Sequence, residues 1–405
     1  MKLLKIIFGL LLFASMLNCG SEETDNEPVA AALSVSSIAE FSANAQIQSL
    51  AVIANVYWYT ENNNDWITLS PTNGINNGTI SISVSANPTE AQRTGIIRVL
   101  GEDEGISKNM TISQAGKAPA PSSGSLDPNM APSENFDLST WNLSIPVDRG
   151  NGTATTITVN EINNSYTNNS FFYTAGDGGM VFKCPVAGFK TSVNTSYTRV
   201  ELREMLRGVN TSIKTQGVNK NNWVFGTAPA ADKIAAGGVD GEMNATLAVN
   251  HITTSGSDGQ VGRVIVGQIH ANDDEPVRLY YRKLPGNSLG SIYFAHEPTD
   301  GNGSEQWHEM IGTRSNSASN PVDGIALDEK FSYRIKVVGD VLTVIIFREG
   351  KANVVKTVNM ATSGFNVGGQ YMYFKAGVYN QNNTGDPDDY VQATFYELEK
   401  SHSTN

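Results

Sequence analysis

The 405-residue sequence has little charge, almost no cysteine and no sustained helical pattern. Charged residues make up only 17% of the chain, which excludes a coiled coil. Two cysteines, Cys19 and Cys184, are too few for a disulfide scaffold. The formal net charge of -12 argues against a nucleic-acid partner, because such binding needs a basic footprint. An acidic protein of this kind can still carry one basic groove.

Glycine and short β-branched runs are abundant instead. The chain has 38 glycines, and turn residues separate short runs rich in Val, Ile and Tyr. This pattern is typical of strands joined by tight turns. Hydrophobic residues account for 40% of the chain, which is enough to build a core. We therefore expect an all-β protein, and the length predicts two or three domains.

Residues 1–19 have the features of an export signal. Lys2 and Lys5 precede an apolar stretch that is too short to span a membrane, and the stretch ends at Cys19. A cysteine in this place resembles a bacterial lipoprotein signal, in which the thiol is acylated after cleavage; an ordinary cleaved signal is the alternative. The resemblance implies an outer-membrane lipoprotein on the cell surface, anchored to the membrane through Cys19, with residues 20–32 as a tether. A periplasmic or secreted protein is the other possibility.

Residues 33–116 predict a small immunoglobulin-like sandwich. About seven strand-like runs alternate with turns such as Asn73-Gly74 and Asn77-Gly78. Four segments of this region together resemble a BACON domain, a small sandwich that accompanies exported glycan-active proteins: Asn64–Pro71, Gly78–Ile82, Arg93–Ile97 and Ile112–Gly116.

Two tryptophans of this sandwich have two possible roles. Trp58 and Trp66 would either stack against sugars or pack in the core, and a tryptophan in a small sandwich is more often a core residue. The Pro-, Ser- and Gly-rich residues 117–130 predict a semi-stiff linker to the next domain.

Residues 131–402 predict a second β domain, a two-sheet jelly roll, from strand signals that recur along the whole segment. One strand places Arg199, Glu201 and Arg203 at alternate positions, about 6–7 Å apart on one face, with Val200 and Leu202 on the other. Alternation alone is typical of any half-exposed strand.

Two further strands repeat this arrangement. Gln268 and His270 share one face, and Tyr373, Lys375, Tyr379 and Gln381 share another. Gly377 interrupts the latter row, which suggests a gap where a ligand lies close to the backbone. Together the three rows predict a groove rich in cations and hydrogen-bond donors on an acidic protein.

The three rows, in this order, resemble the signature blocks of alginate lyases of polysaccharide lyase family 7. The flanking segments Ser139–Pro146 and Phe182–Ser192 extend the resemblance to nearly all of residues 131–402. Val200 departs from the family, which usually has Ser or Thr there, but an inward side chain should not affect the chemistry. The family implies a β-jelly roll (a concanavalin-like two-sheet sandwich), a polyuronate substrate, alginate, and no cofactor.

The resemblance also implies roles for individual residues. Arg199 and Gln268 would neutralise the sugar carboxylate, and His270 and Tyr379 would supply the base and the acid. Glu201 would hold an arginine in place. Arg278 and Lys283 lie on opposite faces of one strand, so at most one of these two residues reaches the predicted groove. The candidate substrate-binding residues are Glu201, Arg203, Arg278, Lys283, Tyr373, Lys375, Asn380 and Gln381.

Several alternatives compete with a lyase. A glycoside hydrolase needs two placed carboxylates, whereas the rows offer only Glu201. A non-catalytic glycan-binding lipoprotein would not need His270 or Tyr379.

The five histidines lack paired ligand spacing, so we expect no catalytic metal, although a structural cation in the loop Asp386–Asp389 is an alternative. We expect a monomer that cleaves within chains and accepts guluronate-containing blocks, the preference that Ile269 indicates in the family.

Overall fold

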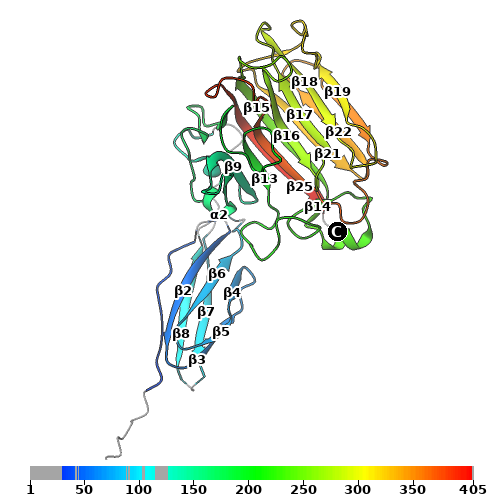
Figure 1. Cartoon of the computed structure of the whole chain (residues 1–405). Coiled ribbons are helices and arrows are strands. Elements are labelled where there is room, and N and C mark those ends of the chain that lie inside the picture. The colour runs from blue at the N-terminus through cyan, green and yellow to red at the C-terminus, as the bar shows by residue number, and fades with distance from the viewer. Residues whose placement is uncertain are drawn as a thin grey trace, which may run out of the picture.

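The structure, a computed structural model, describes residues 30–114, except 42, 44, 88, 90–91 and 103–104, together with residues 126–403. The predicted signal segment with Cys19, most of the tether and most of the linker lie outside the described residues. Figure 1 shows two β sandwiches, a small one in blue and cyan and a larger one built from residues 126–403. No helix within the described ranges is both long and apolar enough to cross a membrane.

The small sandwich consists of two four-stranded antiparallel sheets. The first has the order β1 (Leu33–Val35), β2 (Gln46–Ala54), β6 (Gly78–Val84) and β4 (Ile67–Ser70). The second has the order β5 (Asn73–Ile75), β3 (Tyr57–Asn62), β7 (Arg93–Gly101) and β8 (Ser107–Gln114).

The tryptophans of the small sandwich serve its packing. Trp58 is 1% exposed in the core, and its indole N–H donates to the Asn76 carbonyl over 2.8 Å. Trp66 is half-buried beneath the guanidinium of Arg93, which lies 4.4 Å from the ring centre. Neither ring forms an open platform, which agrees with the core interpretation.

The large sandwich has a nine-stranded sheet and an eight-stranded sheet. The first runs β10 (Ala154–Ile157), β9 (Trp141–Asp148), β13 (Arg199–Glu204), β24 (Tyr373–Asn380), β16 (Arg263–His270), β17 (Val277–Arg282), β18 (Leu289–His296) and β19 (Gln306–Ile311), with β20 (Ile325–Ala326) beside β18. The second runs β11 (Phe172–Thr174), β12 (Met180–Pro185), β25 (Tyr390–Ser403), β15 (Gly238–His251), β21 (Phe331–Val338), β22 (Val341–Phe347) and β23 (Val354–Asn359), with β14 (Trp223–Val224) beside β15. The short helices are α1 (Pro132–Asn135), α2 (Val159–Ile162) and α3 (Ala230–Ala235).

The core of the large sandwich fills the space between its two sheets. Val200 and Leu202 of β13 point into it from one sheet, and Phe182 and Phe395 do so from the other. The predicted all-β jelly roll is confirmed. Because each strand alternates, the polar neighbours of these core residues lie on the outer face of the nine-stranded sheet.

A small contact joins the two sandwiches. Ala45 and Ile47 of the small domain pack against a cluster that includes Val159 of α2 and Met205. The side-chain amide of Gln46 donates to Asn164 Oδ1 over 2.7 Å. Figure 1 shows α2 at this junction.

A buried ionic cluster ties the last strand to the nine-stranded sheet. Glu204 is fully buried, and its Oε1 lies 2.9 Å from Lys400 Nζ and 2.8 Å from His402 Nε2. Its Oε2 accepts from the backbone N–H of Phe374 over 3.0 Å. Burial by itself would raise the pKa of Glu204, but Lys400 and His402 outweigh it and hold that pKa well below its ordinary range.

We expect Glu204→Gln to lower the free energy of unfolding by about 1–3 kcal/mol at neutral pH, because it removes the buried charge that the Lys400 ammonium and the His402 imidazole contact. A carboxyl with a depressed folded pKa stabilises the fold above its unfolded pKa of about 4.3, and the stabilisation fades as the pH falls. Urea unfolding at neutral and acidic pH measures this. A difference between wild type and variant that stays constant on acidification would contradict the assignment.

Candidate active site

The three predicted polar rows lie side by side on one face. In the nine-stranded sheet β24 is hydrogen-bonded to β13 on one side and to β16 on the other. The registers set Arg199 opposite Tyr379, Gln268 opposite Lys375 and His270 opposite Tyr373. The fold thus brings together polar side chains from three distant parts of the sequence.

Glu201 is the centre of this face. Its carboxylate is 1% exposed and lies 3.1 Å from Arg199 Nη1 and 2.5 Å from Lys375 Nζ. Gln268 Nε2 donates to the other carboxylate oxygen. The buried Glu201 carboxylate therefore holds the Arg199 and Lys375 cations and the Gln268 amide in fixed positions. For Arg199, this is the role that the sequence suggested for Glu201.

Two arginines stack on two tyrosines of β24. The guanidinium of Arg199 lies 3.8 Å from the ring centre of Tyr379, and that of Arg203 lies 3.8 Å from the ring centre of Tyr373. Arg203 also donates to the Thr215 carbonyl over 3.0 Å. The stacking leaves both arginines little freedom to change position.

His270 has a defined tautomer. Its Nδ1 lies 2.6 Å from the carbonyl of Ala271, which can only accept, so Nδ1 carries a hydrogen. Its ring stacks on Tyr373 with centres 5.0 Å apart. Burial lowers the pKa of His270 to about 3, and the charge of Lys375 adds to this effect. The imidazole is therefore neutral at ordinary pH and able to accept a proton at Nε2.

Tyr379 and Lys375 respond to the same burial in opposite senses. Burial raises the pKa of Tyr379, with Arg199 opposing and Glu201 adding to the rise. Burial lowers the pKa of Lys375 to about 8, with Arg199 adding to the shift and Glu201 opposing it. The Tyr379 phenol thus keeps its proton at neutral pH, so it suits the role of a proton donor.

Three predicted substrate-binding positions differ from the rest in their surroundings. Asn380 points away from the face that carries the three rows: it is fully buried and its amide donates to the Cys184 carbonyl, which corrects its assignment to sugar binding. Gln381 is 5% exposed, and its Nε2 has no hydrogen-bond partner among the described residues. Lys283 lies one residue beyond β17, on the side of its core-facing residues.

Of the predicted pair, Arg278 is the one that lies on the same face as the three rows. Its guanidinium contacts Glu275 at 3.8 Å, Glu297 at 3.0 Å and also Glu305. Three carboxylates from the ends and loops of neighbouring strands thus surround it. A sugar carboxylate would have to compete with them for this arginine.

Gly377 also has a different role from the predicted one. Its φ is +131°, and a Cβ there would lie 2.6 Å from the carbonyl oxygen of Val200. The pairing of β24 with β16 shifts register next to it, between Ile265 and Gly267. Glycine is thus required by a β-bulge and by close backbone packing, which corrects the prediction of a gap for ligand.

An aromatic cluster on the same face was not predicted from the sequence. Tyr280 and Tyr293 stack with centres 5.0 Å apart, and the half-buried Trp307 packs on both rings. The cluster includes Ile265 and Tyr379, so it adjoins the catalytic candidates. Tyr280 lies between the core residues Leu279 and Tyr281 of β17. This alternation could have predicted that Tyr280 lies on the outer face.

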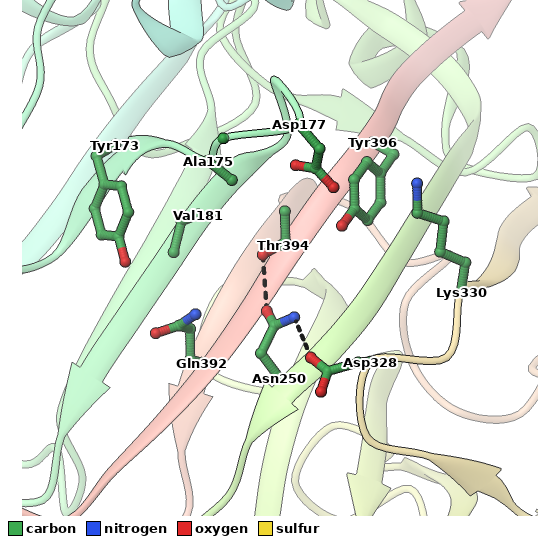
Figure 2. A pocket seen from close by; sticks show the side chains of 11 residues that line it. Tyr173, Ala175, Asp177, Val181, Asn250, Asp328, Lys330, Gln392, Thr394 and Tyr396 are labelled. Carbon is green, nitrogen blue, oxygen red and sulfur yellow. Dashed lines mark hydrogen bonds between the residues drawn. The ribbon is translucent and has the colours of Figure 1, made fainter. Parts of the chain in front are cut away.

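A separate hollow of about 610 Å³ lies on the other sheet. Its walls come from β11, β12, β15 and β25 and include Tyr173, Gln392 and Tyr396 (Figure 2). Asp177 and Asp328 face it together with Lys330. The hollow therefore lies opposite the three rows and has no cluster of cations comparable with that around Glu201.

The loop proposed for a structural cation is held by protein groups. Asp389 Oδ2 accepts from the backbone N–H groups of Thr254 and Ser255 at 2.8 and 2.9 Å. Across the described part of the chain, no three His, Cys, Asp or Glu side chains gather in a way that could hold a metal ion.

Comparisons with known proteins assign both sandwiches. A family model described as alginate lyase matches residues 136–402. The BACON family model, described as a putative N-terminal binding domain, matches residues 56–115. An alginate lyase from Klebsiella pneumoniae is 59% identical over 280 residues, which cover 67% of this chain and 91% of that protein.

Solved structures give the same result. The crystal structure of the alginate lyase from Klebsiella pneumoniae is 58% identical, covers 67% of this chain and 99% of its own, and has a TM-score of 0.67. Alginate lyase A1-II', a member of polysaccharide lyase family 7, is 28% identical over 68% of this chain and all of its own, with a TM-score of 0.50. A histidine-to-asparagine, tyrosine-to-phenylalanine variant of A1-II' was crystallised with the substrate GGMG, at 28% identity over 69% of this chain and 99% of its own and a TM-score of 0.50.

Proposed function

The chain belongs to the alginate lyase family, polysaccharide lyase family 7, and from this premise we propose that this polysaccharide lyase cleaves alginate by β-elimination. The observation that carries the proposal is the cationic cluster of Arg199 and Lys375 on Glu201, beside a neutral His270 and a protonated Tyr379. This arrangement supplies the three groups that the reaction needs.

The first group is a cationic site for the uronate carboxylate. The C5 proton of a uronate is only weakly acidic while the C6 carboxylate is ionised. Arg199 and Gln268, both held by Glu201, would bind that carboxylate and stabilise the negative charge that develops on it in the transition state. Because Glu201 fixes them in advance, little reorganisation is needed during the reaction.

The other two groups are the base and the acid. His270 Nε2 would take the C5 proton as the C5–H bond breaks, and Tyr379 would donate its phenolic proton to O4 as the C4–O4 bond breaks. A double bond forms between C4 and C5, which leaves a 4,5-unsaturated uronate at the new non-reducing end. The A1-II' variant with a replaced histidine and a replaced tyrosine was crystallised with substrate, which supports roles for these two residue types.

Absorbance in the ultraviolet tests this proposal directly. The full chain with alginate is expected to produce the absorbance of an unsaturated uronate in step with new reducing ends. A hydrolase would release reducing ends without that absorbance, and an inactive binder would release neither. Either result from folded protein would refute β-elimination.

We further propose that cleavage is endolytic and that guluronate-containing blocks are accepted. Polar and aromatic groups extend over the outer face from Arg199 on β13 to Trp307 on β19. Five strand spacings of about 4.8 Å give about 24 Å, which suits several sugar units of one chain. Ile269 has the identity expected for guluronate acceptance, and it is fully buried between Gln268 and His270. A product series dominated by monomers, or preference for pure mannuronate blocks, would contradict these two points.

We also propose a surface lipoprotein anchored through Cys19. The support is the sequence pattern alone, a short apolar stretch that ends at this cysteine. A Cys19→Ser variant is expected to leave the membrane fraction, and unchanged fractionation would favour an ordinary secretory signal.

A further inference from the structure

We propose that Glu275 is a positioning residue that controls the base His270: a protonated Glu275 blocks His270 Nε2, and an ionised Glu275 frees it. The proposal rests on the proposed function, since it concerns the base of the elimination. Glu275 lies outside the three polar rows, in the loop between β16 and β17.

The geometry leaves His270 one available nitrogen. Its Nδ1–H is committed to the carbonyl of Ala271 at 2.6 Å, so only Nε2 can take the C5 proton. That Nε2 lies 3.3 Å from Oε1 of Glu275. An imidazole lone pair and an ionised carboxylate are both acceptors, so they attract each other only when a proton lies between them.

The position of Glu275 is fixed by its surroundings. The backbone N–H of Glu297 donates to the Glu275 carbonyl over 3.1 Å, and the loop is closed by a bond from Ala271 N to the Asp274 carbonyl over 2.8 Å. The ring of His270 is held against Tyr373. The backbone of Glu275 and the ring of His270 are therefore both held in place, and the Glu275 side chain reaches from one to the other.

The charges around the pair decide which residue holds the proton. Arg278, Glu297 and Lys375 act on Glu275, and Glu305 faces it across Arg278. Lys375, Arg199 and Arg203 act on His270, which packs on the Tyr373 ring. Three cations thus disfavour an imidazolium, while neighbouring glutamates disfavour a carboxylate at Glu275.

The pKa values agree with this arrangement. Burial raises the pKa of Glu275 to about 7; Arg278 opposes the rise and Glu297 adds to it. Burial lowers the pKa of His270 to about 3. Below about pH 7 the proton therefore resides on Glu275, where its O–H can turn from Glu297 to Nε2 across the 3.3 Å contact and occupy the base.

Ionisation of Glu275 reverses this state. Above about pH 7 the carboxylate no longer donates to Nε2, so the lone pair can meet the C5–H bond. Once Nε2 has taken the C5 proton, the Nε2–H bond can break in turn and an O–H bond can form at Glu275. The Glu275 side chain is 17% exposed and can pass the proton to water, which regenerates the free base.

The test is the pH profile of kcat/KM on polyguluronate for the full chain. Wild type is expected to rise between about pH 6 and 8. In Glu275→Gln the amide N–H₂ donates to Nε2 at every pH, so the rise should vanish and kcat at about pH 8 should fall at least tenfold with KM unchanged. In Glu275→Ala the blocking donor is gone, so the profile should be flat and activity at about pH 6 should equal or exceed wild type.

Glu305→Gln is the matched control, because Glu305 contacts Arg278 and has no bond to His270. This variant should retain the rise. A wild-type rise that persists in Glu275→Gln or in Glu275→Ala overturns the proposal, and the alanine variant decides the matter if the glutamine variant fails to fold. Absence of unsaturated product from wild type would instead mean that the proposed function fails.

Discussion

Tyr379→Phe is expected to lower kcat by about 10²–10⁴-fold with little change in KM. The substitution keeps the ring, and with it the stacking of Arg199 at 3.8 Å. It removes the phenolic proton, which burial retains on Tyr379 and which would pass to the leaving O4. Because that transfer occurs only in the transition state, the loss should appear in turnover. Steady-state kinetics on alginate measure both constants.

Tyr197→Phe is the control for this experiment. Tyr197 packs edge-on against Tyr379 with ring centres 6.1 Å apart, and its hydroxyl accepts a long bond of 3.4 Å from Gln260. It lies outside the three rows, so loss of its hydroxyl should leave kcat close to that of wild type. A folded Tyr379→Phe enzyme with full activity would refute the role of Tyr379 as the acid.

The sequence was sufficient to predict the rows because alternation and burial are coupled in a two-sheet sandwich. Val200 and Leu202 are apolar and inward, so Arg199, Glu201 and Arg203 must be outward. The same logic placed Gln268 and His270 around Ile269, which is fully buried. Nothing beyond local pattern was needed for these positions.

The alternation pattern was not sufficient to predict side-chain positions where the pairing of two strands changes register, or where a loop folds back onto the outer face of the nine-stranded sheet. The bulge at Gly377 depends on the proximity of the Val200 carbonyl, which only the paired strand reveals. Asn380 is held by the Cys184 carbonyl from the opposite sheet. Glu275 reaches His270 from a loop, and a charge in a loop has no periodicity to mark it. These features come from tertiary contacts.

Glu201→Ala is expected to destabilise the large domain by about 3–5 kcal/mol, because it leaves buried cations without their shared anion. Arg199 and Lys375 both contact the Glu201 carboxylate, at 3.1 and 2.5 Å, and Gln268 bonds to it as well. Urea unfolding at neutral pH measures this loss. Glu61→Ala is the control, since its bond to Arg98 is exposed and worth about 0–1 kcal/mol.

The conservative Glu201→Gln variant separates stability from catalysis. It keeps the shape and one acceptor but removes the charge, so Lys375, whose pKa burial already lowers to about 8, loses the neighbour that opposes this shift. We expect kcat to fall because Arg199 and Gln268 are no longer held ready for the sugar carboxylate. An anionic oligouronate would replace the missing charge, so it should raise the melting temperature of this variant more than that of wild type. Equal shifts in both proteins, with unchanged kcat, would mean that Glu201 does not organise the site.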